Sequence, residues 1–191
     1  MTQYHNIPPV YDINSKVLIL GSFPSVKSRE AKFFYGHPQN RFWKVLSAVL
    51  GCDCPVTTEE KKAMLLSHNI AVWDVIDSCE ITGSSDAPIR LVIPNDIASL
   101  VMKTSIKAIF ANGATSYNMY KRYCRDAVGL EAVKLPSTSP ANASYSLERL
   151  TEEWSSQLLS VLSEEFIVIL RCFAFLMRWS IRIRIAFSSY T

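Results

Sequence analysis

The chain has 191 residues, 49% of them hydrophobic and only six of them glycine, a composition that fits one globular domain and excludes a disordered chain. Of its 20 Lys and Arg and 17 Asp and Glu, four Arg and two Glu lie after residue 163, so residues 1–163 carry 16 basic and 15 acidic side chains. This near balance excludes a strongly basic protein, and any binding of nucleic acid must therefore rely on local charge.

The cysteines and histidines argue against a metal centre. Five cysteines are scattered along the chain without a signal peptide before them, which predicts reduced thiols in a cytoplasmic protein. Residues 52–54 read Cys-Asp-Cys, and no C-x-x-C pair typical of a zinc site occurs. The histidines also lie far apart in the sequence, at His5, His37 and His68. We therefore expect neither a metal nor a cofactor.

Strands and helices are predicted to alternate along the chain. The first half predicts a polar surface arm over residues 1–14, a buried strand over 16–20, helices over 40–50 and 57–68, and a strand over 70–75. Gly51 ends the first helix, and a capping box of Thr57 and Glu60 opens the second.

The second half continues the same alternation. Residues 78–91 read as a loop, followed by a short helix over 94–103, a strand over 106–110, a helix over 114–124, a strand over 131–135 and an amphipathic helix over 146–162. This order predicts an α/β fold, a three-layer α/β/α sandwich with a four-stranded, mostly parallel sheet.

Residues 164–191 differ from the rest of the chain. Apolar runs over 166–170 and 172–177 are separated by Arg171, and neither approaches the ~20 residues of a membrane span. The mixture of aromatics and arginines leaves three interpretations: an interfacial segment, an added strand or partner-binding helix, or an extension beyond a complete domain. We favour the last, which places the domain at residues 1–163.

Three short segments carry the polar groups best suited to a ligand site. The turn GSFPS, residues 21–25, directly follows an apolar strand. The segment YGHPQNRFW, residues 35–43, opens the first helix, and LPSTSPANA, residues 135–143, follows the last strand. Such turns place backbone N–H groups and hydroxyls at the carboxyl end of a sheet, where α/β folds bind ligands.

In this order the three segments resemble the hypoxanthine-DNA glycosylase branch of the uracil-DNA glycosylase superfamily, and the resemblance covers roughly residues 10–162. It implies a monofunctional enzyme of base excision repair that hydrolyses the N-glycosidic bond of hypoxanthine, the deaminated form of adenine. The substrate would be damaged DNA with its nucleotide flipped out of the duplex. The resemblance further implies a monomer without a cofactor, cytoplasmic and associated with the nucleoid in a prokaryote.

Asn40 is the candidate catalytic residue. By pattern alone it is the N-cap of the helix that starts there, a role that Asn fills well. The resemblance instead makes it the Asn of a His-Pro-x-Asn motif, which holds the attacking water near C1′ of the sugar. Related mismatch-specific uracil-DNA glycosylases carry their catalytic Asn in the turn after the first strand, where this chain has Phe23. An amide suffices because the sugar becomes oxocarbenium-like and the water need not be fully deprotonated.

The resemblance implies a base-binding group of Tyr35, Phe23, Asp74 and His37. Tyr35 matches the aromatic on which the flipped base stacks, a contact worth ~1–3 kcal/mol. Asp74 ends the second strand, near a base-reading position of relatives. Structural alternatives are core packing for Tyr35, a buried capping carboxylate for Asp74 and a loop role for His37. Asn112, at the end of the third strand, is interpreted as a turn residue.

Two hydroxyl-rich loops are the predicted DNA contacts. The loop after the last strand matches the superfamily loop that enters the duplex and supplies Ser137, Thr138, Ser139 and Asn142. The turn after the first strand supplies Ser22, Ser25, Lys27 and Ser28. Hydroxyls and backbone N–H groups bind phosphates without adding charge, which suits a domain of near-zero net charge. Without the resemblance, the later loop would be an ordinary connection.

Three other functions stay open from the sequence. A mismatch-specific uracil or thymine glycosylase fits the same segments, although Phe23 replaces its catalytic Asn. A non-catalytic nucleic-acid-binding module would keep the stacking aromatic and the phosphate loops without turnover. A membrane-surface protein would use the segment over 164–191.

Overall fold

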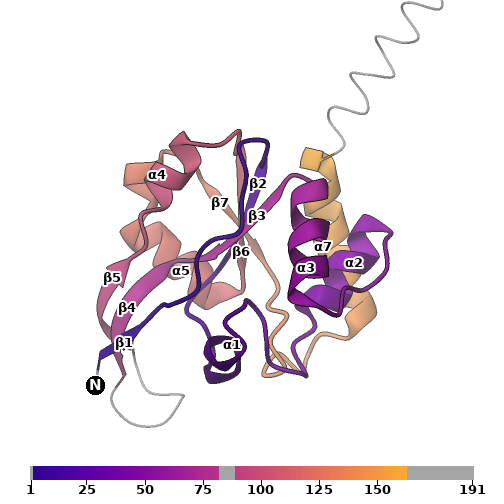
Figure 1. The fold of residues 1–191 in the computed structure, drawn as a ribbon, viewed down its shortest axis with the longest axis horizontal. Coiled ribbons are helices and arrows are strands. Elements are labelled where there is room, and N and C mark those ends of the chain that lie inside the picture. The colour runs from indigo at the N-terminus through magenta and orange to yellow at the C-terminus, as the bar shows by residue number, and fades with distance from the viewer. Residues whose placement is uncertain (1, 82–88, 163–191) are drawn as a thin grey trace, which may run out of the picture.

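A four-stranded parallel sheet forms the centre of the protein (Figure 1). The computed structural model describes residues 2–81 and 89–162. The strand order is β3-β2-β6-β7, with β2 at Val17–Gly21, β3 at Ile70–Asp74, β6 at Ala108–Asn112 and β7 at Ala132–Leu135. Every residue of β2 is buried, as expected for a strand covered on both faces. The predicted four-stranded sheet is confirmed, and its strand pairs are all parallel.

The strand order places a topological switch point between β2 and β6. After β2 the chain adds β3 on one side, and it later crosses over to add β6 on the other side. The carboxyl ends of these two strands, Gly21 and Asn112, therefore lie near each other at one edge of the sheet. Open α/β sheets bind ligands in the crevice at this point.

Helices cover both faces of the sheet (Figure 1). One face carries α2 (Phe42–Leu50), α3 (Thr58–Ser67) and α7 (Leu147–Leu162). The other face carries α4 (Ile97–Met102), α5 (Ala114–Tyr123) and the short α6 (Arg125–Val128). A separate cluster of buried apolar side chains lies under each layer of helices. The predicted three-layer sandwich is therefore confirmed.

Local signals in the sequence set the boundary between α2 and α3. Gly51 has φ 67° and ψ 32°, the left-handed conformation that ends α2 and favours glycine. The predicted capping box opens α3: the Thr57 hydroxyl accepts from the Glu60 N–H, and the Glu60 carboxylate accepts from the Thr57 N–H.

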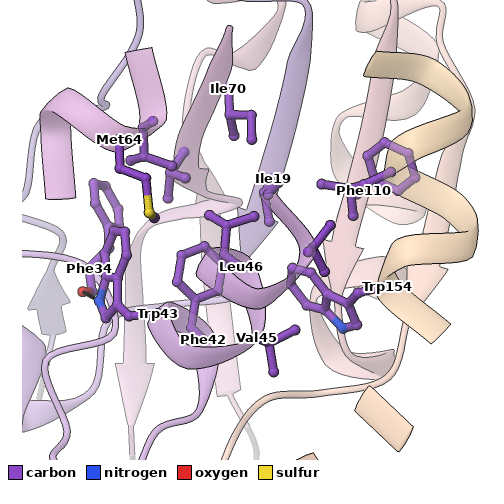
Figure 2. Close-up of a cluster of buried hydrophobic side chains, with 14 of the residues drawn as sticks. Ile19, Phe34, Phe42, Trp43, Val45, Leu46, Met64, Ile70, Phe110 and Trp154 are labelled. Carbon is purple, nitrogen blue, oxygen red and sulfur yellow. Dashed lines mark hydrogen bonds between the residues drawn. The ribbon is translucent and has the colours of Figure 1, made fainter. Parts of the chain in front are cut away.

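Aromatic side chains join α2 to α7 within the core (Figure 2). The Phe42 ring packs edge-on against Trp43 and Trp154, with centroid distances of 4.9 and 5.8 Å. The indole N–H of Trp43 donates to the Phe34 carbonyl at 3.3 Å. The indole N–H of Trp154 donates to the Pro136 carbonyl at 3.0 Å. The core thereby fixes the segment before α2 and the segment after β7, which both border the sheet edge.

A separate antiparallel sheet departs from the sequence prediction. β4 (Ile76–Ile81) pairs with β1 (Thr2–Tyr4) on one side and with β5 (Ile89–Pro94) on the other. The expected loop over 78–91 is therefore wrong where β4 and β5 lie, while residues 82–88 fall outside the described residues. Register irregularities between β4 and β5 break the alternation by which a strand is recognised in a sequence.

The N-terminal arm belongs to the core, so the prediction of a surface arm is wrong. Ile7 and Val10 are 3% and 7% exposed. Val10 exchanges backbone hydrogen bonds with Val72 of β3, at 3.0 and 2.9 Å. Prolines at 8 and 9 interrupt the apolar pattern around them, which is why the sequence reads as polar and irregular there. A short helix, α1 (Val26–Glu30), also replaces part of the expected loop after β2.

The predicted domain boundary at residue 163 and the segment over 164–191 lie outside the described residues, so both stay predictions. Within the described ranges, none of the helices combines the length and apolar content that a bilayer crossing requires.

Trp154→Ala tests how strongly α7 holds the core. The side chain is fully buried, so its removal should lower the free energy of unfolding by about 3–5 kcal/mol. Leu159→Ala is a control on the same helix, where the residue is 41% exposed, and it should cost clearly less. Urea denaturation measures both, and equal losses would contradict the core described above.

Candidate active site

A cavity of about 190 Å³ opens at the switch point, where β2, β3 and β6 end. The turn over residues 21–25 forms part of its wall, and further lining comes from Ser28, Phe34, Tyr35, Asn40, Asp74, Asn112, Ser137 and Ser139. The three segments singled out in the sequence therefore meet in one place.

A wider groove of about 780 Å³ adjoins the cavity, between the start of α5 and the loop after β7. The residues that line both spaces are Ser22, Asn112, Ser137 and Ser139. The cavity and the groove therefore lie side by side and share these four residues as a common wall. In such an arrangement one small ring can enter the cavity while the chain that carries it lies in the groove.

Gly21 allows close packing on the floor of the cavity. A Cβ atom at this position would lie 2.0 Å from Asp74 Oδ1 and 3.3 Å from the Tyr35 hydroxyl. The first distance is far inside van der Waals contact, so any other residue would displace the carboxylate. The end of β2 thus brings the Asp74 carboxylate and the Tyr35 hydroxyl to the same spot.

Asp74 is almost fully buried beneath the cavity. Its Oδ2 lies 2.8 Å from His5 Nε2, and the two side chains are 6% and 1% exposed. Its backbone carbonyl accepts from Asn95 Nδ2 at 2.9 Å. Oδ1 lies over Gly21 and receives no hydrogen bond from the described residues. The carboxylate therefore has one oxygen held by the protein and one available to a ligand.

Tyr35 packs its ring against Phe42, with centroids 3.8 Å apart and planes 16° apart. Its backbone has φ 53°, a left-handed conformation that is uncommon for a tyrosine. The hydroxyl is buried and has no partner among the described residues. Burial raises the pKa of this hydroxyl above its usual range, and the nearby Asp74 charge raises it further. The Asn112 side chain lowers the pKa by a smaller amount. Tyr35 is therefore a protonated hydrogen-bond donor at neutral pH.

Asn40 binds the start of α2 and lines the cavity. Its Oδ1 accepts from the Phe42 N–H at 3.0 Å, although the N-cap position of α2 is held by Arg41, one residue later than the sequence predicts. The same oxygen accepts from the Thr138 hydroxyl at 3.0 Å. Because both lone pairs of Oδ1 are used, the Nδ2 amide is the part of the side chain left for a ligand.

Thr138 fixes the orientation of the Asn40 side chain through the hydrogen bond to Oδ1. It is fully buried. Asn112 holds it on two sides, with Nδ2 donating to the Thr138 hydroxyl at 2.9 Å and Oδ1 accepting from the Thr138 N–H at 2.9 Å. The Thr138 hydroxyl is therefore engaged inside the protein, and its contact with a phosphate stays a prediction. Asn112, read from the sequence as a turn residue, also lines the cavity.

Arg41 ties the loop after β7 to the start of α2. Its guanidinium Nη2 donates to the carbonyls of Ser139 and Asn142 at 2.8 and 2.9 Å, and Nη1 donates to the carbonyl of Tyr145. Its backbone N–H donates to the Thr138 carbonyl at 3.1 Å. One arginine therefore fixes the shape of a loop that lies about 100 residues away in the sequence.

The sequence profile of the Uracil DNA glycosylase superfamily matches residues 8–162. The chain belongs to this superfamily. Hypoxanthine DNA glycosylase of Methanosarcina acetivorans is 36% identical over 151 residues, which cover 78% of this chain and 94% of that protein. Hypoxanthine DNA glycosylase of Methanosarcina barkeri is 35% identical over 137 residues, covering 71% and 85% of the two chains.

A solved structure agrees with the superfamily assignment. The solution NMR structure of a proposed uracil DNA glycosylase from Methanosarcina acetivorans superposes with a TM-score of 0.71 at 31% identity. The match covers 82% of this chain and 96% of that one. The resemblance to the uracil-DNA glycosylase superfamily, drawn from three sequence segments, is confirmed.

Some predicted site residues of this superfamily member lie away from the cavity. His37 lines neither space, and its Nδ1 accepts from the Gln39 N–H of its own loop at 3.2 Å. Lys27 also lines neither space and pairs with Glu30 on the surface of α1, at 2.8 Å. The roles of these two residues toward base and DNA stay predictions.

Other predicted residues hold the walls together. Ser28 is buried, and its hydroxyl accepts from the Gly36 N–H at 3.1 Å. The Ser25 hydroxyl accepts from the Ser28 N–H at 3.2 Å and caps α1. Asn142 donates through Nδ2 to the Ser137 carbonyl at 2.8 Å. Ser25 and Ser28 thus shape their loop and also line the cavity, together with Ser22, Phe23, Ser137 and Ser139, while Asn142 lines the groove.

Sequence reasoning missed His5 and Arg41. His5 stood alone in an arm expected on the surface, and the sequence gives no sign of its pairing with Asp74. Arg41 was part of a quoted motif, but the sequence gives no sign that it binds the loop after β7. Within the described ranges, no group of three or more His, Cys, Asp and Glu side chains is placed to hold a metal ion.

Arg41→Lys tests the connection between α2 and the loop after β7. Lysine keeps the charge but cannot reach three carbonyls from one planar group, so the free energy of unfolding should fall by about 2–3 kcal/mol. Amide hydrogen exchange over 137–145 should become faster. Arg122→Lys, at an exposed arginine that packs over Tyr123, serves as the matched control and should change neither measurement.

Proposed function

We propose that this protein is a monofunctional DNA glycosylase that releases hypoxanthine from a nucleotide extruded from the duplex. Relatives at 36% and 35% identity are named hypoxanthine DNA glycosylase. The observation that carries the proposal is the cavity at the switch point, where Asp74, Tyr35 and Asn40 surround a space suited to one planar base.

Asp74 supplies the chemistry that distinguishes a deaminated base from its parent. Deamination converts N1 of adenine from a hydrogen-bond acceptor into an N–H donor. Asp74 Oδ1, which takes no hydrogen bond from the described protein, is an acceptor for that N–H. Adenine would place its N1 acceptor against the carboxylate, and polar sites reject such mismatches strongly.

Aromatic side chains would hold the base in the cavity. The Phe42 ring stacks on one face of the Tyr35 ring. We propose that the base contacts the part of the Tyr35 ring that Phe42 leaves uncovered. Phe23 stands on the turn after β2, with the Arg29 guanidinium 5.6 Å from its ring. His37 is not included among the proposed base contacts because it lines neither space.

Asn40 is the proposed catalytic residue. Phe42 N–H and the Thr138 hydroxyl hold Oδ1, and this fixes the Nδ2 amide in the cavity wall. The amide would hold a water by its oxygen beside C1′ of the sugar. A water held in this way retains a lone pair for attack, and an oxocarbenium-like sugar requires no strong base.

The groove is the proposed seat of the DNA backbone. Gly113, the N-cap of α5, and Ala114 and Thr115 of its first turn line the groove. The Gly113 N–H already donates to the Leu135 carbonyl at 2.9 Å, and no side chain of the described residues caps the N–H groups that follow. Helix N-termini bind phosphates well. Ser22, Ser137 and Ser139 add neutral donors along the same groove. We further propose that the protein acts on DNA as a monomer in the cytoplasm.

A second candidate is removal of uracil or thymine from mismatches. The observation in its favour is the same Asp74 oxygen, because N3–H of uracil is also a donor. A non-catalytic binding module is the third possibility, and it predicts binding without release of any base.

Incubation with duplexes that carry one inosine, uracil or mismatched thymine tests the function. We expect fastest release of hypoxanthine and no release of adenine from an undamaged duplex. Borohydride should trap no protein–DNA adduct, because water rather than an amine attacks the sugar. Binding without release of any of the bases would establish the non-catalytic module instead.

Asn40→Ala separates catalysis from capping. If Asn40 holds the water, single-turnover cleavage of inosine DNA should slow by about two orders of magnitude or more. Loss of the cap should also cost about 1 kcal/mol of stability.

Thr57→Ala is the matched control, since it removes the cap of α3, which starts outside the cavity. It should cost a similar free energy and leave the chemical step unchanged. An Asn40→Ala enzyme that cleaves as fast as Thr57→Ala would restrict Asn40 to the capping role.

A further inference from the structure

The N-terminal strand places a buried histidine under the cavity floor. β1 pairs with β4, and the His5 N–H extends the pairing by donating to the Asp77 carbonyl at 2.6 Å. The imidazole, 1% exposed, lies 6.2 Å from the Phe23 ring and 6.1 Å from the Phe34 ring, measured between centroids. Phe23 and Phe34 both line the cavity.

The backbone sets which nitrogen of His5 carries the proton. The Ile7 N–H donates to Nδ1 at 3.3 Å, so Nδ1 is an acceptor. Nε2 then carries the hydrogen and donates it to Asp74 Oδ2 at 2.8 Å. A chain of contacts thus runs from a backbone amide through His5 to Asp74, and it ends at Oδ1 over Gly21.

We propose that His5 is a positioning residue that fixes the Asp74 side chain so that the cavity reads a ring N–H. The proposal rests on the function proposed above and deepens it. The two oxygens of a carboxylate are both acceptors, so in the natural protein His5 does not choose which kind of atom faces the base. It fixes only where Oδ1 lies. An amide at position 74 would have distinct ends, and His5 would then decide which end faces the base.

Asp74→Asn tests which end of the amide His5 selects. The His5 Nε2–H requires an acceptor, so the new amide should turn its oxygen to His5 and its NH₂ group to the base. The NH₂ group is then a donor that opposes the N1–H donor of hypoxanthine and can donate a hydrogen bond to N1 of adenine. The probes are two duplexes with non-cleavable 2′-fluoroarabino nucleotides, one carrying inosine and the other adenosine.

The expected result is a loss of preference. Asp74→Asn should reduce the inosine-to-adenosine affinity ratio by a factor on the order of 100 or more. The cost of extruding each nucleotide is the same for every variant, so it cancels when the ratios of two variants are compared.

The decisive step adds a second substitution. With His5→Leu in the Asp74→Asn background, the amide is free to rotate, and the inosine preference should recover by at least roughly tenfold. If His5 had only a structural role, adding His5→Leu would lower the inosine-to-adenosine affinity ratio further instead of restoring it. Asp74→Asn with His5→Gln gives the same expectation in a variant closer to the natural side chain, because both amides can rotate together. His68→Leu in the same background is the control, because its ring binds Met64 away from the cavity.

The outcomes separate the two proposals. A natural protein that neither binds inosine DNA preferentially nor releases hypoxanthine overturns the proposed function, and this inference with it. A natural protein that does both leaves the function standing. In that case, an unchanged ratio in Asp74→Asn, or no recovery in either double variant, overturns the positioning role of His5.

Discussion

The site depends on one connection, formed by two adjacent residues at the start of α2. Asn40 accepts from the Thr138 hydroxyl, and Arg41 donates to carbonyls of the loop that follows Thr138. The sheet supplies a rigid floor at Gly21, but the opposite wall is a loop without regular structure. These hydrogen bonds give that loop a defined shape, and the cavity exists only while it is held against the sheet.

Most of the fold follows from local signals, and for that reason it could be predicted. An apolar run gives β2, a glycine ends α2, and the Thr57 capping box opens α3. β4 and β5 could not be predicted in the same way, because irregular pairing hides their alternation. β1 has the same difficulty: a three-residue strand has too few positions to establish a pattern and depends on β4 for its hydrogen bonds.

The candidate site could be predicted where a side chain follows a strand or opens a helix. Asp74, Asn40 and Ser137 are examples, and all line the cavity. The partners of these residues could not be predicted. His5 lies 69 residues from Asp74 and Asn40 lies 98 residues from Thr138, and nothing in the composition near either residue indicates its partner. Thr138 and Ser139 look equivalent in the sequence, yet the first is buried and the second lines the cavity.

The contacts of Arg41 also bear on the near-zero net charge of residues 1–163. The guanidinium is held by carbonyl oxygens and forms no ion pair with a described residue, so no carboxylate within the described ranges lies against its charge. Carbonyls orient toward the cation without removing its field. A loop of serine, threonine and proline therefore encloses one positive charge, supplied by Arg41 and not by a residue of the loop itself. An approaching polyanion would meet a cation fixed beneath neutral hydroxyls, in a protein whose total charge suggests little attraction.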